Sequence, residues 1–133
     1  MKTLMVSGKR KKAIASALIK EGTGTIKINS RPIEEHTPDL AKQKIMEPLV
    51  IAGERTGKVD IKVNVRGGGA IGQAEAARLA IAKALVAFTK DKKLEKEFLD
   101  YDRQLLVADV RQRETRKPNT AGKARAKVQK SYR

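Results

Sequence analysis

The chain has 133 residues, with 30 Lys and Arg against 15 Asp and Glu, which gives a net charge of +15. This excess predicts an anionic partner, either a nucleic acid or an anionic membrane. Cysteine is absent, which excludes disulfides and thiolate metal sites, and no apolar run of about 18 residues could span a bilayer. Two Phe, two Tyr and no Trp are too few for a sheet that stacks bases on aromatic rings. The N-terminus lacks the long apolar stretch of a signal peptide, so we expect a cytosolic protein.

The N-terminal segments have the composition of short strands and turns. Thr3–Val6 predicts a strand, and the four cations Lys9–Lys12 predict an exposed turn. Ala13–Lys20 predicts a second strand, which Glu21–Gly24 ends with turn residues. Thr25–Asn29 (TIKIN) alternates apolar and polar residues as a third strand does. We expect the second and third strands to form a hairpin.

A first helix is predicted to begin at Thr37. Threonine can accept hydrogen bonds from the free amides of a helix start, and Pro38 suits the first helical position. The helix is expected to run to about Glu47, where Pro48 bends or ends it, and Gly53 closes the region.

The second half of the chain carries the clearest periodic patterns. In Val59–Arg66 (VDIKVNVR), Val and Ile alternate with polar residues, so one face enters the core and the other is covered by either water or RNA. Ile71–Thr89 is the strongest helix, and its Ala-rich first half permits a close approach to a sheet. Lys92–Leu99 predicts a short helix, and Leu105–Val107 predicts a short strand or extended segment. The apolar stripe of the long helix consists of Ala74, Ala77, Ile81, Leu85 and Phe88.

A change of composition near residue 110 predicts two parts, a globular α/β body over residues 1–110 and a basic tail over residues 111–133. The tail has nine Lys and Arg and one acid, Glu114. It has almost nothing to bury, so it cannot offset its chain entropy by packing on itself. We expect an extended polyanion to order it. The tail is also not amphipathic, which argues against binding at a membrane surface.

Gly67–Gly72 contains a GxGxxG pattern between the predicted strand and helix, which is the context of a dinucleotide-binding loop. Such a fold also needs a second parallel strand ending in an acid, whereas Asp91 lies in a charged helical stretch. Gln73 occupies the position where a Walker loop has Lys. Two interpretations remain open, a tight turn that requires glycine and a helix N-terminus whose amides bind an RNA phosphate. Arg66, directly before the run, favours the second.

Groups for catalysis or metal binding are sparse. His36 is the only histidine, and without a second His or any Cys it is expected to be a surface or capping residue. Asp100–Arg103 suggests either a catalytic pair of carboxylates or a helix-end ion-pair network, and adjacent acids beside Arg favour the network. In so basic a chain, Lys9–Lys12 are expected to contact phosphate. We expect no enzymatic activity, no cofactor and no metal.

Three segments carry a family resemblance. Gly67–Leu85 (GGGAIGQAEAARLAIAKAL) resembles the signature of small-subunit ribosomal protein S-nine, with three Gly, a small residue and Gln, and then Ala-rich spacing. Tyr101–Glu114 (YDRQLLVADVRQRE) and the ending Gln129–Arg133 (QKSYR) are similar to the archaeal and eukaryotic branch. The resemblance covers the chain from about Leu4 onward. It departs from the branch pattern at Val110, where Pro is usual, at Val128, where Phe is usual, and in the tail over residues 115–124.

The resemblance implies a single α+β domain with a mostly four-stranded sheet and packed helices, similar to the second domain of ribosomal protein S-five. It also implies a cytoplasmic ribosomal protein that binds small-subunit rRNA in the subunit head, beside neighbouring small-subunit proteins. The tail is expected to reach the anticodon stem-loop of the peptidyl-site tRNA. Resemblance and charge together predict rRNA contacts at Lys9, Arg10, Lys11, Lys12, Arg66, Gly67, Gly68, Gly69, Arg111, Arg113, Arg116, Lys117, Lys123, Arg125 and Lys127. The residues expected near tRNA are Lys130, Ser131, Tyr132 and Arg133.

Two other functions compete with this one. The first is a general basic protein that compacts DNA or RNA, which would bind duplex DNA as well as it binds RNA. The second is a small nucleotide-binding enzyme that uses the Gly67–Gly72 loop, which would bind NAD or ATP saturably.

Overall fold

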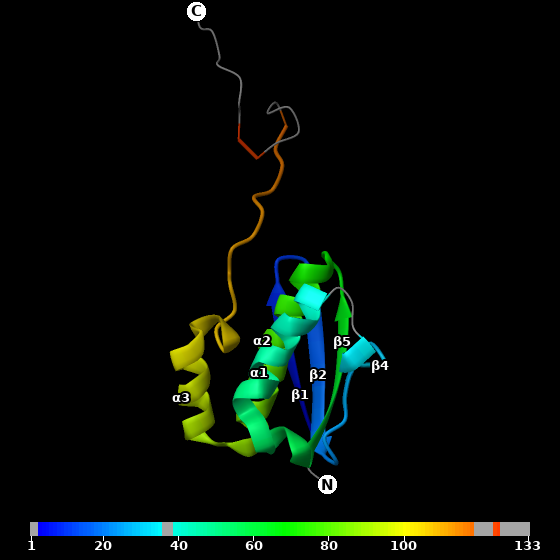
Figure 1. The fold of residues 1–133 in the computed structure, drawn as a ribbon. Helices are drawn as coiled ribbons and strands as arrows, with labels where there is room; N and C mark the ends of the chain where they lie inside the picture. Colours follow the sequence, from blue (N-terminus) through cyan, green and yellow to red (C-terminus); the bar gives the residue numbers. More distant parts are fainter. Residues whose placement is uncertain (1–2, 36–38, 119–123, 126–133) are drawn as a thin grey trace, which may run out of the picture.

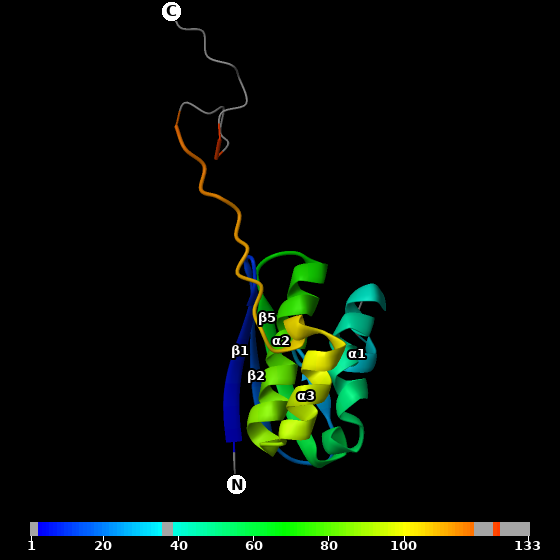
Figure 2. The same cartoon turned by 90° about the vertical axis from the view of Figure 1, so that its left-hand side faces the viewer.

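The computed structural model describes residues 3–35, 39–118 and 124–125 and places the helices together on one face of a single sheet (Figures 1 and 2). The fold is α+β, as the resemblance implied. In the described part of the chain no helix has the length and apolar character needed to cross a membrane. With η marking 3-10 helices, the elements in chain order are β1 (Thr3–Arg10), β2 (Ala13–Glu21), β3 (Ile26–Ile28), β4 (Arg31–Pro32), η1 (Ile33–Glu35), α1 (Asp39–Ala52), η2 (Gly53–Lys58), β5 (Val59–Arg66), α2 (Ala70–Thr89), α3 (Lys92–Tyr101) and η3 (Arg103–Leu105).

The sheet has five strands in the order β1-β2-β5-β3-β4. Because β4 has only two residues, the expected four-stranded sheet is present with a short edge strand added. β1 pairs with β2 and β2 with β5, both antiparallel. The predicted alternation in β5 is confirmed, since its Val and Ile residues are buried and its polar residues lie on the other face. The helices cover only the apolar face.

The first hairpin is formed by β1 and β2, and it corrects the extent of the predicted four-cation turn. Lys9 and Arg10 belong to β1, and only Lys11 and Lys12 form the turn. Lys11 has a φ of 54°, which suits the two-residue turn of a hairpin. Because side chains alternate along a strand, Lys9 and Arg10 point to opposite faces of the sheet.

The predicted hairpin between residues 13–20 and 25–29 is wrong, because β5 lies between β2 and β3. β3 pairs with β5 in parallel, and α1 lies between them in the sequence. In Figure 1 the helices lie in front of the sheet, β3 and β5 run upward, and β5 lies to the left of β3. This arrangement is a left-handed crossover, the rare hand for such a connection. β2 and β5 are both long, so they pair along most of their length, whereas β3 has three residues to pair.

The segment between β2 and β3 passes over the beginning of β5 and is held there by hydrogen bonds. The amide of Gly22 donates to the carbonyl of Lys58 at 3.0 Å. The carboxylate of Asp60 accepts the amides of Thr23 and Thr25, each at 3.0 Å. The turn residues seen in the sequence therefore form a connection to a more distant strand.

α1 continues past the proline that was expected to bend or end it. Pro48 lies inside the helix, which extends to Ala52. Leu49 and Ala52 are buried beyond it, and their packing offsets the one hydrogen bond that the missing N–H removes. The predicted start at Thr37, and His36 beside it, lie outside the described residues.

α2 is the central helix, and most of its surface is buried. Of the predicted stripe all but Phe88 are buried, and Phe88 is half-buried. Ala76, Leu79, Ala80, Ala82 and Ala84 are buried as well, because sheet and α1 pack on different sides of this helix.

The Ala-rich part of α2 approaches β1 so closely that its neighbour must be glycine. A Cβ atom at Gly8 would lie 2.6 Å from the carbonyl oxygen of Ala76 and 2.9 Å from the amide nitrogen of Ala80. Both atoms belong to the helix backbone, which cannot rotate away as a flexible side chain can.

The last helix, α3, begins at the predicted residue. The segment after it does not have the predicted structure. Asp91 caps α3 by accepting from the amides of Lys93 and Leu94. The strand or extended segment predicted at Leu105–Val107 is wrong, because Leu105 ends η3 and a turn and a bend follow. Leu105 is fully buried, so the chain turns inward to bury this side chain instead of pairing with the sheet.

Replacement of Gly8 by Ala is expected to lower the free energy of unfolding by about 1–3 kcal/mol, because the added methyl overpacks the contact with α2. Urea denaturation followed by circular dichroism measures the change. Gly57→Ala is the matched control, since no atom lies within 4 Å of a Cβ there. Equal stability of the two variants would contradict the close contact.

Candidate nucleic-acid interface

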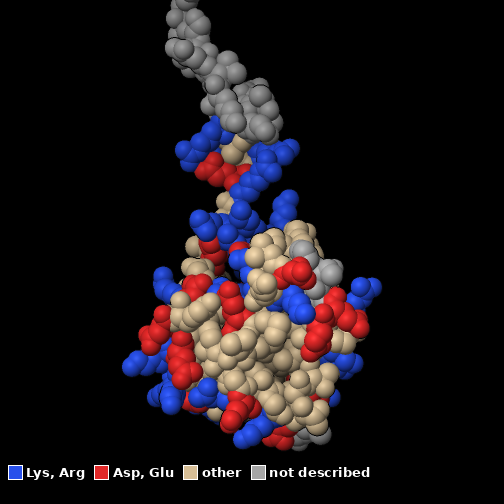
Figure 3. All heavy atoms as spheres, in the orientation of Figure 1, with Lys and Arg blue, Asp and Glu red and all other residues tan. Residues whose placement is uncertain are grey.

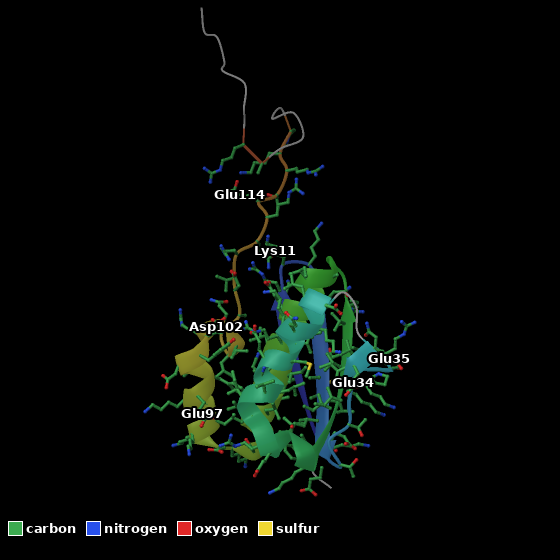
Figure 4. The ribbon with its side chains drawn as sticks, viewed as in Figure 1. Lys11, Glu34, Glu35, Glu97, Asp102 and Glu114 are labelled. Carbon is green, nitrogen blue, oxygen red and sulfur yellow. The ribbon has the colours of Figure 1, made fainter. Side chains whose placement is uncertain are left out.

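A groove of ≈ 850 Å³ lies at the end of the body from which the tail leaves. Its walls come from the β1–β2 turn, the glycine run at the start of α2 and the first tail residues. The cations that line it are Arg10, Lys11, Lys12, Arg111 and Arg113, and its one acid is Glu75. Figure 3 shows Lys and Arg side chains gathered where the tail meets the body, and Figure 4 shows Lys11 beside the tail. The fold thus brings together three predicted sites that are far apart in the sequence.

The glycine run is required by close backbone contacts. Gly67 and Gly68 have φ values of 78° and 66°, in the left-handed region that glycine favours. A Cβ atom at Gly67 would lie 2.4 Å from the carbonyl oxygen of Lys12. The carbonyl of Gly67 accepts a hydrogen bond from the side chain of Gln73 at 3.1 Å. The tight-turn interpretation is therefore confirmed, and the Gln of the family signature holds the turn.

The start of α2 is compatible with the second interpretation as well. Gly69 is the N-cap and offers no side chain to cap the first amides. Gly69 and Gly72 line the groove, so the positive end of a 20-residue helix opens beside the turn cations. Arg66 lies elsewhere, because it shares the uncovered face of the sheet with Lys62 and Asn64.

The dinucleotide interpretation of the glycine run has no support in the described residues. No strand follows α2 there, so the second parallel strand of such a fold is missing. The acid at the expected distance, Asp91, caps α3 and forms an ion pair with Arg55 at 2.9 Å.

An ion-pair cluster fixes the root of the tail on the body. The guanidinium of Arg10 contacts Glu75 on α2 at 2.7 Å and also contacts Asp109. Asp109 in turn binds Arg111 at 2.7 Å. The Arg10 side chain is only 18% exposed, whereas that of Arg111 is 77% exposed. Arg10, predicted to bind RNA, is therefore committed to holding the tail, and Arg111 presents its outer side to the groove.

Asp109 stays ionised near neutral pH. Hydrogen bonds from the side chain and then the amide of Arg111 hold the pKa of Asp109 far below its ordinary value of 3.8. A carboxylate with a lowered pKa stabilises the folded arrangement above the ordinary pKa and loses that contribution as the pH falls through the lowered one. The ion pairs of Asp109 at the tail root therefore persist throughout the physiological pH range.

A second ion-pair cluster is centred on Arg78 and connects α2 with its neighbours. Arg78 on α2 binds Glu47 on α1 at 2.6 Å and Asp102 at 3.0 Å, and its side chain is 12% exposed. Asp102 also caps η3 through the amide of Gln104. The predicted ion-pair network at residues 100–103 thus exists at Asp102, with a partner from α2. A signal for both clusters was visible in the sequence, since Glu75 and Arg78 interrupt an otherwise Ala-rich helix.

The described part of the tail leaves the body as an exposed chain without regular secondary structure (Figures 1 and 2). Arg113, Arg116 and Lys117 are exposed along it. The one acid of the tail, Glu114, pairs with Arg125 at 2.7 Å. The other predicted tail contacts, Lys123, Lys127, Lys130, Ser131, Tyr132 and Arg133, lie outside the described residues.

Replacement of Asp109 by Asn is expected to release the tail root, because Arg10 and Arg111 lose their shared carboxylate. Limited trypsin digestion followed by mass spectrometry should then show faster cleavage after Arg111, with the unfolding of the body little changed. Asp100→Asn, an exposed change on α3, is the control. Identical cleavage rates in the two variants would contradict the anchoring of the tail root by Asp109.

Comparison with known proteins identifies the chain's relatives. The family model described as "Ribosomal protein S9/S16" matches residues 8–133. Proteins named "Small ribosomal subunit protein uS9" from Methanococcus maripaludis (strain C7) and Methanococcus vannielii are each 48% identical to it over 134 residues, covering 100% of both chains. These are archaeal ribosomal proteins and not enzymes, which confirms the resemblance seen in the sequence. The chain belongs to the ribosomal protein S9/S16 family.

Proposed function

We propose that this chain is a structural component of the cytoplasmic small ribosomal subunit, which binds rRNA of the subunit head through the groove and the tail. The observation that carries the proposal is the groove itself, where cations of the β1–β2 turn and of the tail root lie beside an uncapped helix start. The printed name of the relatives supports the small subunit as the place of assembly.

The groove is suited to phosphate because its charges act together. Lys11 and Lys12 form no ion pair with any described residue, and the helix start adds partial positive charge from its free amides. Arg111 and Arg113 of the tail also line the groove. A phosphate in this groove meets positive charge from three segments of the chain. None of these contacts distinguishes one base from another.

The tail carries further phosphate-binding cations away from the body. Its 23 residues reach ~75 Å when fully extended at ~3.3 Å per residue. The ion pairs of Asp109 fix the point on the body from which the tail extends. In the proposed division, the cations up to Lys127 hold rRNA, and Lys130, Ser131, Tyr132 and Arg133 contact the anticodon stem-loop of the peptidyl-site tRNA. The tRNA part rests on the family resemblance alone.

Removal of residues 111–133 is expected to flatten the salt dependence of rRNA binding. If the full chain makes ~6–10 phosphate contacts, its affinity falls roughly 10³–10⁵-fold between 50 and 200 mM salt. Filter binding to a small-subunit rRNA transcript over that range measures the slope. A tailless chain with an unchanged slope would contradict the role of the tail, and equal affinity for duplex DNA would favour a general compacting protein.

Deletion of Arg133 is expected to leave subunit assembly intact and to weaken tRNA binding at the peptidyl site. Reconstituted small subunits carrying the variant can be tested by co-sedimentation and by tRNA filter binding. Arg116→Gln removes one charge from the rRNA-binding half of the tail and serves as the control, with tRNA binding unchanged. Unaltered tRNA binding by the Arg133 deletion would refute the assignment of the last residues.

A further inference from the structure

The face of the sheet opposite the helices is uncovered in the described structure, and we name it the open face. Figure 2 shows the sheet from its edge, with all helices on one side. Met5, on the edge strand β1 of this face, is 71% exposed. By strand alternation the open face carries Thr3, Met5, Ser7, Lys9, Ile14, Ser16, Leu18, Lys20, Lys27, Asp60, Lys62, Asn64 and Arg66.

The open face is strongly cationic. Its one acid, Asp60, already accepts the amides of Thr25 and Thr23, which lower its pKa, and it lies beside Lys20 in the register. Asp60 therefore remains ionised and neutralises at most one neighbour. The five cations of the face are Lys9, Lys20, Lys27, Lys62 and Arg66.

These cations differ from those on the helix side. Arg10, Arg55 and Arg78 each contact two acids. None of the five open-face cations forms an ion pair with a described residue, since the ion pairs all involve other cations. Charge in this protein is thus compensated where it holds the fold together and left uncompensated on the open face.

Two lysines lie directly abreast at the centre of the face. Lys27 on β3 and Lys62 on β5 are register partners, so they lie one strand spacing apart, ~4.8 Å. Like charges in this position repel each other and destabilise the sheet. One phosphate can reach both ammonium groups and convert the repulsion into attraction. Lys62 belongs to the polar face of residues 59–66 that the sequence pattern left to either water or RNA, whereas the pattern gave Lys27 no role.

A hollow of ≈ 280 Å³ adjoins this pair. Ser16 and Asn64 line it and are register partners on β2 and β5. A hydroxyl and an amide at this position can donate to and accept from a ribose 2′-OH or a phosphate oxygen. The open face has no aromatic side chain, so it offers bases no ring to stack on.

We infer that the open face binds the sugar–phosphate backbone of folded RNA, centred on Lys27 and Lys62. It is a second rRNA contact, on the opposite side of the sheet from the helices, and it rests on the proposed function. An acidic peptide is a poorer occupant, because peptides dock by adding a strand at a sheet edge or by filling an apolar groove. The strands at the centre of this face, β2 and β5, are paired on both sides.

The test compares the full chain with K27Q/K62Q in binding to a complete small-subunit rRNA transcript from Methanococcus maripaludis. Loss of two phosphate contacts is expected to reduce the slope of log affinity against log salt by about 1.4–1.8. K27R/K62R keeps the charge and should retain the slope. K92Q/K93Q removes two exposed lysines from α3 and should leave the slope as in the unmodified chain.

Hydroxyl-radical footprinting of the same complexes gives the second readout. In K27Q/K62Q one set of rRNA protections should vanish while those of the groove and tail persist. If K27Q/K62Q matches K92Q/K93Q in slope and footprint, the open face does not bind RNA, although the proposed function stands. If the unmodified chain itself binds without a steep salt dependence, the proposed function fails first and this inference with it.

Discussion

The close contact between α2 and the β1–β2 hairpin is the constraint on which the rest of the structure depends. Gly8 leaves no side chain between the strand and the helix backbone, and Ala13, Ala15 and Ala17 on β2 are fully buried. Small residues on both elements let the backbones approach, and this proximity places the start of α2 beside the Lys11–Lys12 turn. It also draws every helix to one face of the sheet, so the groove and the open face arise from the same packing.

The cations fall into two groups, those that hold the fold together through ion pairs and those that are available to a polyanion. Arg10 and Arg78 are largely buried and bridge acids from different elements, so removing one acid would leave a poorly solvated cation. These two arginines connect α1, α2 and the tail root. The turn lysines and the five cations of the open face form no ion pair with any described residue. A protein with this division can keep a rigid body while its remaining positive charge stays available to phosphate.

Periodicity predicted the elements that are long and amphipathic. Val59–Arg66 and Ile71–Thr89 were placed nearly to the residue, because burial on one face imposes a period of two or of 3.6 residues. Local signals were weaker where tertiary packing competes with them. Pro48 remained inside a helix because the residues beyond it are buried, and Leu105 turned inward to reach the core. The parallel pairing of β3 with β5, and its left-handed crossover, leave no trace in a three-residue strand.

The sequence by itself determined the class of partner, the family and the cationic tail, because charge and motif are properties of the chain alone. The tertiary structure decided which cations act together. It paired Arg10 with Glu75 and Asp109, and it placed Arg66 on the open face. It also set Lys27 beside Lys62, 35 residues apart in the chain. Such groupings depend on strand order and register, which are fixed by distant contacts and not by local composition.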